Sequence, residues 1–136
     1  EAGHDENITF EEMKKMIGAQ LAEKVKLKSI SIYKKANDLA RKKGIIIADT
    51  KFEFGLDENN RLLLIDEILT PDSSRFWPAA DYKPGQMKDI SLDKQFIRDY
   101  LISINWDKKP PAPVLPKDVV VKTTARYKEA LKRLVN

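Results

Sequence analysis

The chain has 136 residues, with 25 basic and 21 acidic side chains and a formal net charge of +4. A chain of this length usually forms one domain, and 42% hydrophobic residues are enough for an apolar core, so we expect a single domain over residues 1–136. The absence of cysteine excludes disulfides and thiolate sites, and the single histidine excludes a multi-histidine metal centre. The small charge excess does not indicate nucleic acid, and the apolar runs are far shorter than the ~20 residues of a membrane span.

The first predicted element is a long helix over residues 9–43. Thr9 and Glu12 form a capping-box pattern at its start, and apolar residues follow at helical spacing. Gly44 suits a left-handed stop at its end. A helix of this length is unusual in a small domain, and a break near Lys26–Lys28 is compatible with the pattern.

Two strands follow, over residues 45–55 and 62–69, joined by a four-residue loop. The loop sequence Asp57–Asn60 is typical of a turn. Because two strands are marginally stable alone, we expect an α+β fold of one of two kinds. Either helices cover this β-hairpin completely, or it is the edge of a larger antiparallel sheet whose other strands are absent from the chain.

The rest of the chain is predicted as a long loop over residues 70–91, a helix over 93–104, a proline-rich connector and a last helix over 117–134. Loops as long as residues 70–91 are usually functional or disordered. The apolar side of the last helix is expected to carry five residues, namely Val120, Thr124, Tyr127, Leu131 and Leu134.

The register of the hairpin decides which charged side chains meet. If Leu56 pairs with Arg61, Lys51 lies opposite Asp66, and Glu53 is the diagonal neighbour of Asp66 on the same face. Asp49 shares this face, because strand side chains alternate. The sequence therefore predicts three carboxylates and one lysine in a single patch.

Such a patch suits a divalent cation, since Mg²⁺ is commonly held by one or two carboxylates together with substrate phosphates. Lys51 would then meet phosphate or carboxylate oxygens. The alternative is an exposed strand face with ordinary salt bridges, which are common. The apolar runs beside the patch favour the cation site, because they place the charges at the end of buried strands.

Two further clusters suit an anionic ligand. Ser73, Ser74 and Arg75 offer hydroxyls and a guanidinium, although a turn with a surface arginine explains them equally well. Lys94 and Arg98 share one face near a helix N-terminus, which itself attracts anions. The alternative for this pair is a solvated face balanced by the neighbouring aspartates.

Several segments, in this order along the chain, resemble the phosphoribosylaminoimidazole-succinocarboxamide synthase (SAICAR synthetase) family. Each motif is weak alone, but together they span nearly the whole chain. The segments are Gly3–Ile8, Asp49–Gly55, Ile65–Glu67, Leu69–Trp77 and Asp93–Tyr100.

The resemblance implies a cytoplasmic ATP-dependent ligase of purine biosynthesis. It would join L-aspartate to carboxyaminoimidazole ribonucleotide and convert ATP to ADP and phosphate. The implied fold is related to ATP-grasp and kinase-like ATP-binding folds. The implied cofactors are ATP and Mg²⁺, and neither nucleic acid nor a membrane is an expected partner.

The resemblance also implies roles for particular residues. Glu53 and Asp66 would be the Mg²⁺ ligands, and Asp49 and Lys51 would lie at the reaction centre. The implied substrate-binding residues are Ser73, Ser74, Arg75, Lys94 and Arg98, with His4 and Asp5 near the aspartate or nucleotide site.

The chain also departs from the family, whose members are longer and carry a glycine-rich N-terminal lobe over ATP. Only five glycines occur here, and neither a dinucleotide nor a Walker pattern is present. We therefore expect the C-terminal portion of the ligase, without its N-terminal lobe. The alternatives are another Mg²⁺-dependent phosphoryl-transfer domain and a non-catalytic interaction module. A nucleic-acid role ranks last, since aromatic and basic residues are not interleaved.

Overall fold

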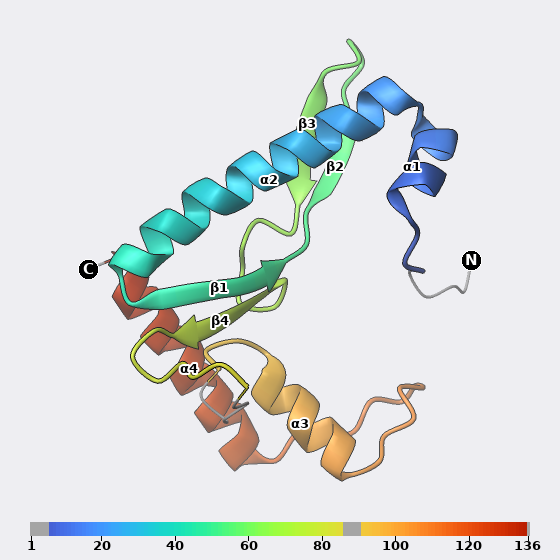
Figure 1. The fold of residues 1–136 in the computed structure, drawn as a ribbon. Helices are drawn as coiled ribbons and strands as arrows, with labels where there is room; N and C mark the ends of the chain where they lie inside the picture. The colour runs from blue at the N-terminus through green and yellow to red at the C-terminus, as the bar shows by residue number, and fades with distance from the viewer. Residues whose placement is uncertain (1–5, 86–90, 136) are drawn as a thin grey trace.

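The computed structural model describes residues 6–85 and 91–135 and has the expected α+β fold (Figure 1). His4 and Asp5 lie outside the described residues. The helices of the described part are α1 (Phe10–Ile17), α2 (Ala19–Lys42), α3 (Gln95–Ser103) and α4 (Lys117–Val135). Its strands are β1 (Ile45–Thr50), β2 (Glu53–Leu56), β3 (Leu62–Asp66) and β4 (Ser74–Pro78).

The first helical region breaks at Gly18. The capping box at its start is confirmed, because the Thr9 amide donates to the Glu12 carboxylate at 2.7 Å and the Glu12 amide donates to the Thr9 hydroxyl at 3.2 Å. Gly18 has a φ of +84°, which ends α1 and starts α2 and favours glycine over other residues. A break near Lys26–Lys28 is wrong, because α2 runs through these good helix formers without interruption.

The prediction of an irregular loop over residues 70–91 is wrong over residues 74–78. These residues form β4, which pairs antiparallel with β1, from Ile45 opposite Pro78 to Thr50 opposite Ser74. Ser74, Phe76 and Pro78 are buried and Arg75 is exposed, which is the alternation of a half-buried strand. The proline conceals this pattern in the sequence, but it occupies the strand end, where proline is tolerated.

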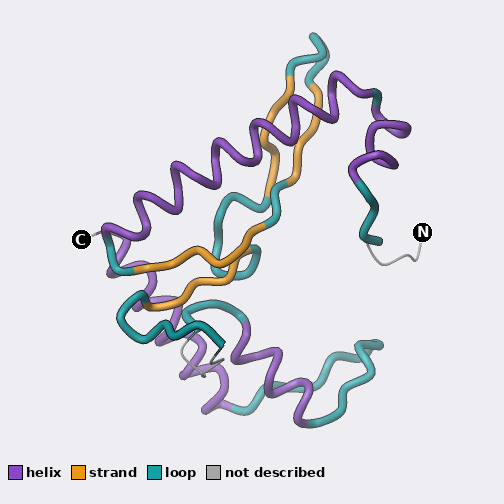
Figure 2. Tube along the Cα trace, in the orientation of Figure 1, coloured by secondary structure: helices purple, strands orange, loops and turns teal. Residues whose placement is uncertain are grey.

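The predicted hairpin exists, but its extent and register differ. The first predicted strand divides into β1 and β2, and β3 ends at Asp66. Leu56 pairs with Leu62, so Arg61 belongs to the turn. The cause is Asp57, whose carboxylate accepts the Asn59 and Arg61 amides at 2.9 and 2.8 Å. The described strands thus form two separate two-stranded sheets, β1–β4 and β2–β3, which extend in different directions (Figure 2).

The apolar core lies between α2, the β1–β4 sheet and α4. Its buried members are Ala40, Ile45, Ile47, Phe76, Leu92 and Ala130. The α2 helix also binds β1 through hydrogen bonds, since the Tyr33 hydroxyl donates to the Ile47 carbonyl at 2.7 Å and the Asn37 side chain accepts the Ile47 amide at 3.3 Å. The core therefore fixes the β1–β4 sheet in place.

The last two helices, α3 and α4, lie where the sequence predicts them. The buried side of α4, however, differs from the predicted apolar side. Val119, Thr123 and Ala130 are buried on α4, whereas Val120 and Leu131 of the predicted apolar side are exposed. Within the described residues, these two side chains therefore leave apolar surface of α4 exposed. No helix in the described part of the chain is both long and apolar enough to cross a membrane.

The core makes a direct prediction for stability. Ile45 is 0% exposed and Ile102, on α3, is 67% exposed. Ile45→Ala should reduce the free energy of unfolding by about 2–5 kcal/mol, since it leaves a cavity beside Phe76. The matched change Ile102→Ala should alter it by less than about 0.5 kcal/mol. Urea denaturation followed by circular dichroism measures both, and equal losses would contradict this core.

Candidate functional site

One cavity, with a volume of about 310 Å³, opens where the β1–β4 sheet meets the start of α3. It is lined mainly by charged and hydroxyl side chains rather than by apolar ones. The lining residues are Asp49, Thr50, Lys51, Asp72, Ser73, Ser74, Arg75, Asp93, Lys94 and Arg98. The structure therefore brings together most of the residues that the sequence analysis singled out, from three separate segments. Glu53 and Asp66 do not line the cavity.

A bidentate ion pair crosses the two strands at the cavity wall. Asp49 lies opposite Arg75 in the β1–β4 register, just after a bulge between Ile47 and Asp49. Arg75 Nε donates to Asp49 Oδ1 at 2.8 Å, and the terminal nitrogen Nη2 contacts Oδ2. The hydrogen bonds from Arg75 hold the pKa of Asp49 below its usual range, and Asp49 in turn raises the pKa of Arg75. Asp49 therefore remains ionised at neutral pH.

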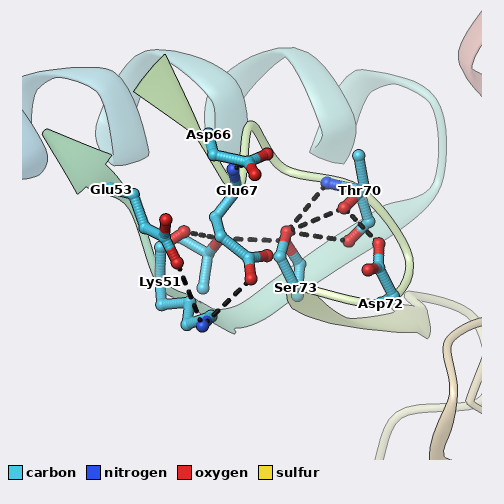
Figure 3. A network of polar contacts seen from close by, with 9 residues as sticks. Lys51, Glu53, Asp66, Glu67, Thr70, Asp72 and Ser73 are labelled. Carbon is cyan, nitrogen blue, oxygen red and sulfur yellow. Dashed lines mark hydrogen bonds and ion pairs between the residues drawn. The ribbon is translucent and has the colours of Figure 1, made fainter. Parts of the chain in front are cut away.

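Hydroxyl groups line the wall beside this ion pair. The hydroxyls of Thr50 and Ser74 share a hydrogen bond of 2.8 Å across the strands. Ser73 Oγ accepts the Thr70 amide at 3.0 Å, in the turn that precedes β4 (Figure 3). Asp72 contacts the Thr70 hydroxyl, which lowers the pKa of Asp72. These contacts fix the turn, so the two serines are held in place before any ligand binds.

Lys51 lies between two glutamates rather than opposite Asp66. Its Nζ is 2.9 Å from Glu67 and 3.5 Å from Glu53 (Figure 3). The hydrogen bond with Glu67 is the main reason that the pKa of Lys51 is raised. No role for Glu67 was predicted from the sequence, because the residue lies within the predicted second strand, over residues 62–69. Glu67 in fact follows the end of β3 with a φ of +59°, a conformation that periodicity does not reveal.

Glu53 and Asp66 are direct partners in the β2–β3 register, not diagonal neighbours. Both are exposed, and Asp66 Oδ1 accepts the Glu67 amide at 2.7 Å. Among residues 6–85 and 91–135, no group of three or more acidic or histidine side chains is arranged to hold a metal ion. Two carboxylates on paired strand positions nevertheless fit Mg²⁺, which is commonly shared between one or two carboxylates and substrate phosphates.

The third wall of the cavity is the start of α3. Lys94 and Arg98 lie one helical turn apart and both line the cavity, as their spacing predicts. The Lys94 amide donates to the Pro71 carbonyl at 3.1 Å, which joins this wall to the turn before β4. Asp93, predicted to start the helix and, in the alternative, to be a solvated partner of the basic pair, is instead buried. Asp93 lies two residues before Gln95, the first residue of α3, and an aspartate near a helix start could have indicated a capping role.

The fold is an α+β domain whose charged cavity carries four cationic side chains, namely Lys51, Arg75, Lys94 and Arg98. A sequence profile described as SAICAR synthetase matches residues 1–113. The chain belongs to the SAICAR synthetase family.

The relatives and solved structures agree with this assignment. The chain is 60% identical over 136 residues to the phosphoribosylaminoimidazole-succinocarboxamide synthase of Thermodesulfovibrio yellowstonii, covering 100% of this chain and 46% of that protein. It is 56% identical over 131 residues to the synthase of Desulfatibacillum aliphaticivorans, covering 96% and 44%. The chain thus spans less than half the length of the curated relatives it matches.

Among solved structures, the SAICAR synthase of Saccharomyces cerevisiae in complex with SAICAR superposes with a TM-score of 0.81 at 46% identity, covering 96% of this chain and 43% of that one. A type-2 SAICAR synthetase in complex with ADP superposes with a TM-score of 0.69 at 30% identity, covering 96% and 45%. Both likenesses extend over nearly all of the present chain.

The Asp49–Arg75 pair predicts a pH-dependent contribution to stability. The folded pKa of Asp49 lies below its ordinary value of 3.8, so the contribution is complete above pH 3.8 and is lost as the pH falls through the folded pKa. For a half-exposed pair it should be about 1 kcal/mol or less.

Asp49→Asn should therefore lower the melting temperature by a few degrees at pH 7, and this difference should shrink at a pH well below 3.8. Thermal denaturation at both pH values measures it. Asp38→Asn on the exposed side of α2 is the matched control and should show no pH-dependent difference. A constant difference for Asp49→Asn would show that the ion pair does not stabilise the fold.

Proposed function

We propose that this chain is the C-terminal, metal- and substrate-binding portion of a cytoplasmic ATP-dependent ligase that makes SAICAR. The reaction would join L-aspartate to carboxyaminoimidazole ribonucleotide and convert ATP to ADP and phosphate. The observation that carries the proposal is the cavity that Arg75, Lys94 and Arg98 line together with Ser73 and Ser74. The relatives' name and the SAICAR and ADP complexes of similar structures support it.

The ribonucleotide fits the cationic part of the cavity. It carries a phosphate and a carboxylate, and both suit guanidinium and ammonium donors. Ser73 and Ser74 add neutral hydroxyl donors on the β4 side, while Lys94 and Arg98 add charge on the α3 side. Arg75 lines the same cavity and can exchange part of its contact with Asp49 for the ligand. In this proposal the two walls together hold the phosphate, and the substrate carboxylate faces the reaction centre at Asp49 and Lys51.

The chemistry requires the substrate carboxylate to become a better acyl donor. In the proposed reaction the carboxylate takes the terminal phosphoryl group of ATP, the aspartate amine attacks the resulting acyl phosphate, and phosphate leaves as the amide forms. Such phosphoryl transfer depends mainly on positioning and charge neutralisation. Lys51 suits this task, because its raised pKa keeps it protonated beside the phosphate oxygens.

Asp49 is better suited to orienting the incoming amine than to deprotonating it. A carboxylate whose pKa is lowered by an arginine is a weak base. It remains a strong hydrogen-bond acceptor for an ammonium or amine group. We therefore assign Asp49 the orientation of the aspartate nitrogen at the reaction centre. His4 and Asp5, proposed near the same substrates, lie outside the described residues.

Glu53 and Asp66 are the proposed Mg²⁺ ligands. The cation would neutralise phosphate charge during transfer. The two carboxylates lie opposite each other at one end of the β2–β3 sheet, where β2 begins two residues after Lys51. Glu53 also contacts Lys51 directly. This contact joins the proposed metal ligands to the edge of the cavity.

The remaining length of the family protein is the proposed partner of this chain. Leu63 and Ile65 of β3 are about half exposed, as are Val120 and Leu131 of α4. Such uncovered apolar surface is typical of an interface. An N-terminal lobe that covers it would also complete the ATP site.

The isolated chain should therefore show no ligase activity. A family-length synthase, such as that of Thermodesulfovibrio yellowstonii, should form ADP in the presence of aspartate, ribonucleotide and ATP, and this chain should reach less than about a thousandth of its rate, since it lacks part of the electrostatic site. A coupled ADP assay measures both rates. Comparable rates would refute the view that this chain is an incomplete portion.

In a family-length synthase, Glu53→Gln and Asp66→Asn should each weaken Mg²⁺ dependence. We expect the Mg²⁺ concentration for half-maximal rate to rise at least tenfold, because second-sphere and ligand carboxylates typically contribute this much. Glu58→Gln, in the exposed turn of the same hairpin, is the matched control. Unchanged Mg²⁺ dependence in both variants would favour the alternative of a structural patch.

A further inference from the structure

Among residues 6–85 and 91–135, Asp93 is the most deeply buried charged side chain that the proposed reaction leaves without a task. It is 1% exposed, although aspartate is rarely buried without compensation. Its Oδ2 accepts the Phe76 amide at 2.9 Å. Its Oδ1 accepts the Gln95 amide at 2.7 Å and the Ser91 hydroxyl at 3.1 Å. The carboxylate is therefore fully committed to hydrogen bonds within the protein.

These bonds join two walls of the cavity. Phe76 directly follows Arg75 on β4, and Gln95 is the first residue of α3, directly after Lys94. A backbone bond of 2.8 Å from the Leu92 amide to the Phe76 carbonyl reinforces the same junction. Any change in the Asp93 contacts would therefore move the α3 cations relative to Arg75.

Asp93 also explains how a basic pair can occupy this end of α3. The first turn of α3 contains no acidic residue, and Lys94 at the N-cap makes no side-chain capping bond. Positive side chains near a helix N-terminus oppose the helix dipole. The Asp93 carboxylate supplies the missing negative charge from one position earlier and accepts a free amide of the first turn. Lys94 and Arg98 can then remain available to a ligand.

We infer that Asp93 is a positioning residue that sets the separation between Arg75 and the Lys94–Arg98 pair, and thereby makes the cavity selective for a phosphorylated substrate over its unphosphorylated counterpart. This inference rests on the proposed function. A phosphate monoester offers three oxygens to donors on opposite walls, so its affinity depends on wall separation. A substrate without the phosphate loses these contacts in any case and should be insensitive to Asp93.

The test uses a family-length synthase carrying Asp93→Asn. Asparagine keeps the size of the side chain but replaces one accepting oxygen with an NH₂ group, which faces a backbone amide that also donates. We expect the KM for the ribonucleotide to rise at least tenfold, with the KM for ATP changed less than twofold. The inhibition constant of ribose 5-phosphate should rise in parallel, and that of ribose should not.

Two matched variants complete the design. Asp99→Asn on the exposed side of α3 changes a carboxylate that accepts a hydrogen bond from the Gln95 side chain at 2.7 Å, and it should leave every constant within twofold. Ser91→Ala removes one of the three bonds to Asp93 and should raise the ribonucleotide KM two- to fivefold. If Asp93→Asn does not fold, Ser91→Ala decides the question.

The outcomes separate the inference from the proposed function. Suppose that Arg75→Gln abolishes ribonucleotide binding, so that the proposed site is correct. If Asp93→Asn then changes the KM values for the ribonucleotide and ATP equally, or changes neither, the positioning role is overturned. If Arg75→Gln leaves ribonucleotide binding intact, the proposed site itself is wrong and the inference fails with it. A selective loss of phosphorylated ligands in both Asp93→Asn and Ser91→Ala would support the positioning role.

Discussion

The antiparallel pairing of β1 with β4 is the constraint on which the rest of the site depends. This pairing places Asp49 opposite Arg75 and Thr50 opposite Ser74, although these residues are far apart in sequence. The core beneath it, with Ile45 fully buried, determines the register, because a shift by one residue would turn the apolar side chains to solvent. Packing and site geometry are therefore set by the same interaction.

Each group of cations at the cavity has an acidic partner in the structure. Arg75 pairs with Asp49, and Lys51 pairs with Glu67, while buried Asp93 balances the start of α3. Arg75, Asp49 and Lys51 are about half exposed, whereas the Glu67 side chain is 20% exposed, so solvent screens both pairs and each stabilises the fold only weakly. A ligand phosphate can replace such a partner at low cost, whereas a buried pair would resist exchange. The exposed pairs hold the side chains in place and still leave them available.

Local signals in the sequence predicted local structure well, but they did not predict which distant segments pair. The capping box of α1, the Asp57 turn and the bounds of α4 follow from neighbouring residues. The β4 strand and the pairing of Glu53 with Asp66 depend on partners elsewhere in the chain. The sequence instead predicted a loop at β4 and a diagonal arrangement of Glu53 and Asp66. Asp93 was missed for the same reason, because its burial depends on contact with β4. Glu67 was missed for a local reason, because its positive φ leaves no periodic signal in the sequence.

The two proposed functional regions of the chain differ in how firmly they are packed. The proposed anion-binding cavity is built on the β1–β4 sheet, which the apolar core fixes through Ile47 and Phe76. The proposed Mg²⁺ ligands Glu53 and Asp66 belong to the β2–β3 sheet, whose Leu63 and other apolar side chains are exposed. A two-stranded sheet is marginally stable without further packing. Geometry at the metal ligands should therefore depend on the remainder of the family-length protein, whereas the cavity is already formed within this chain.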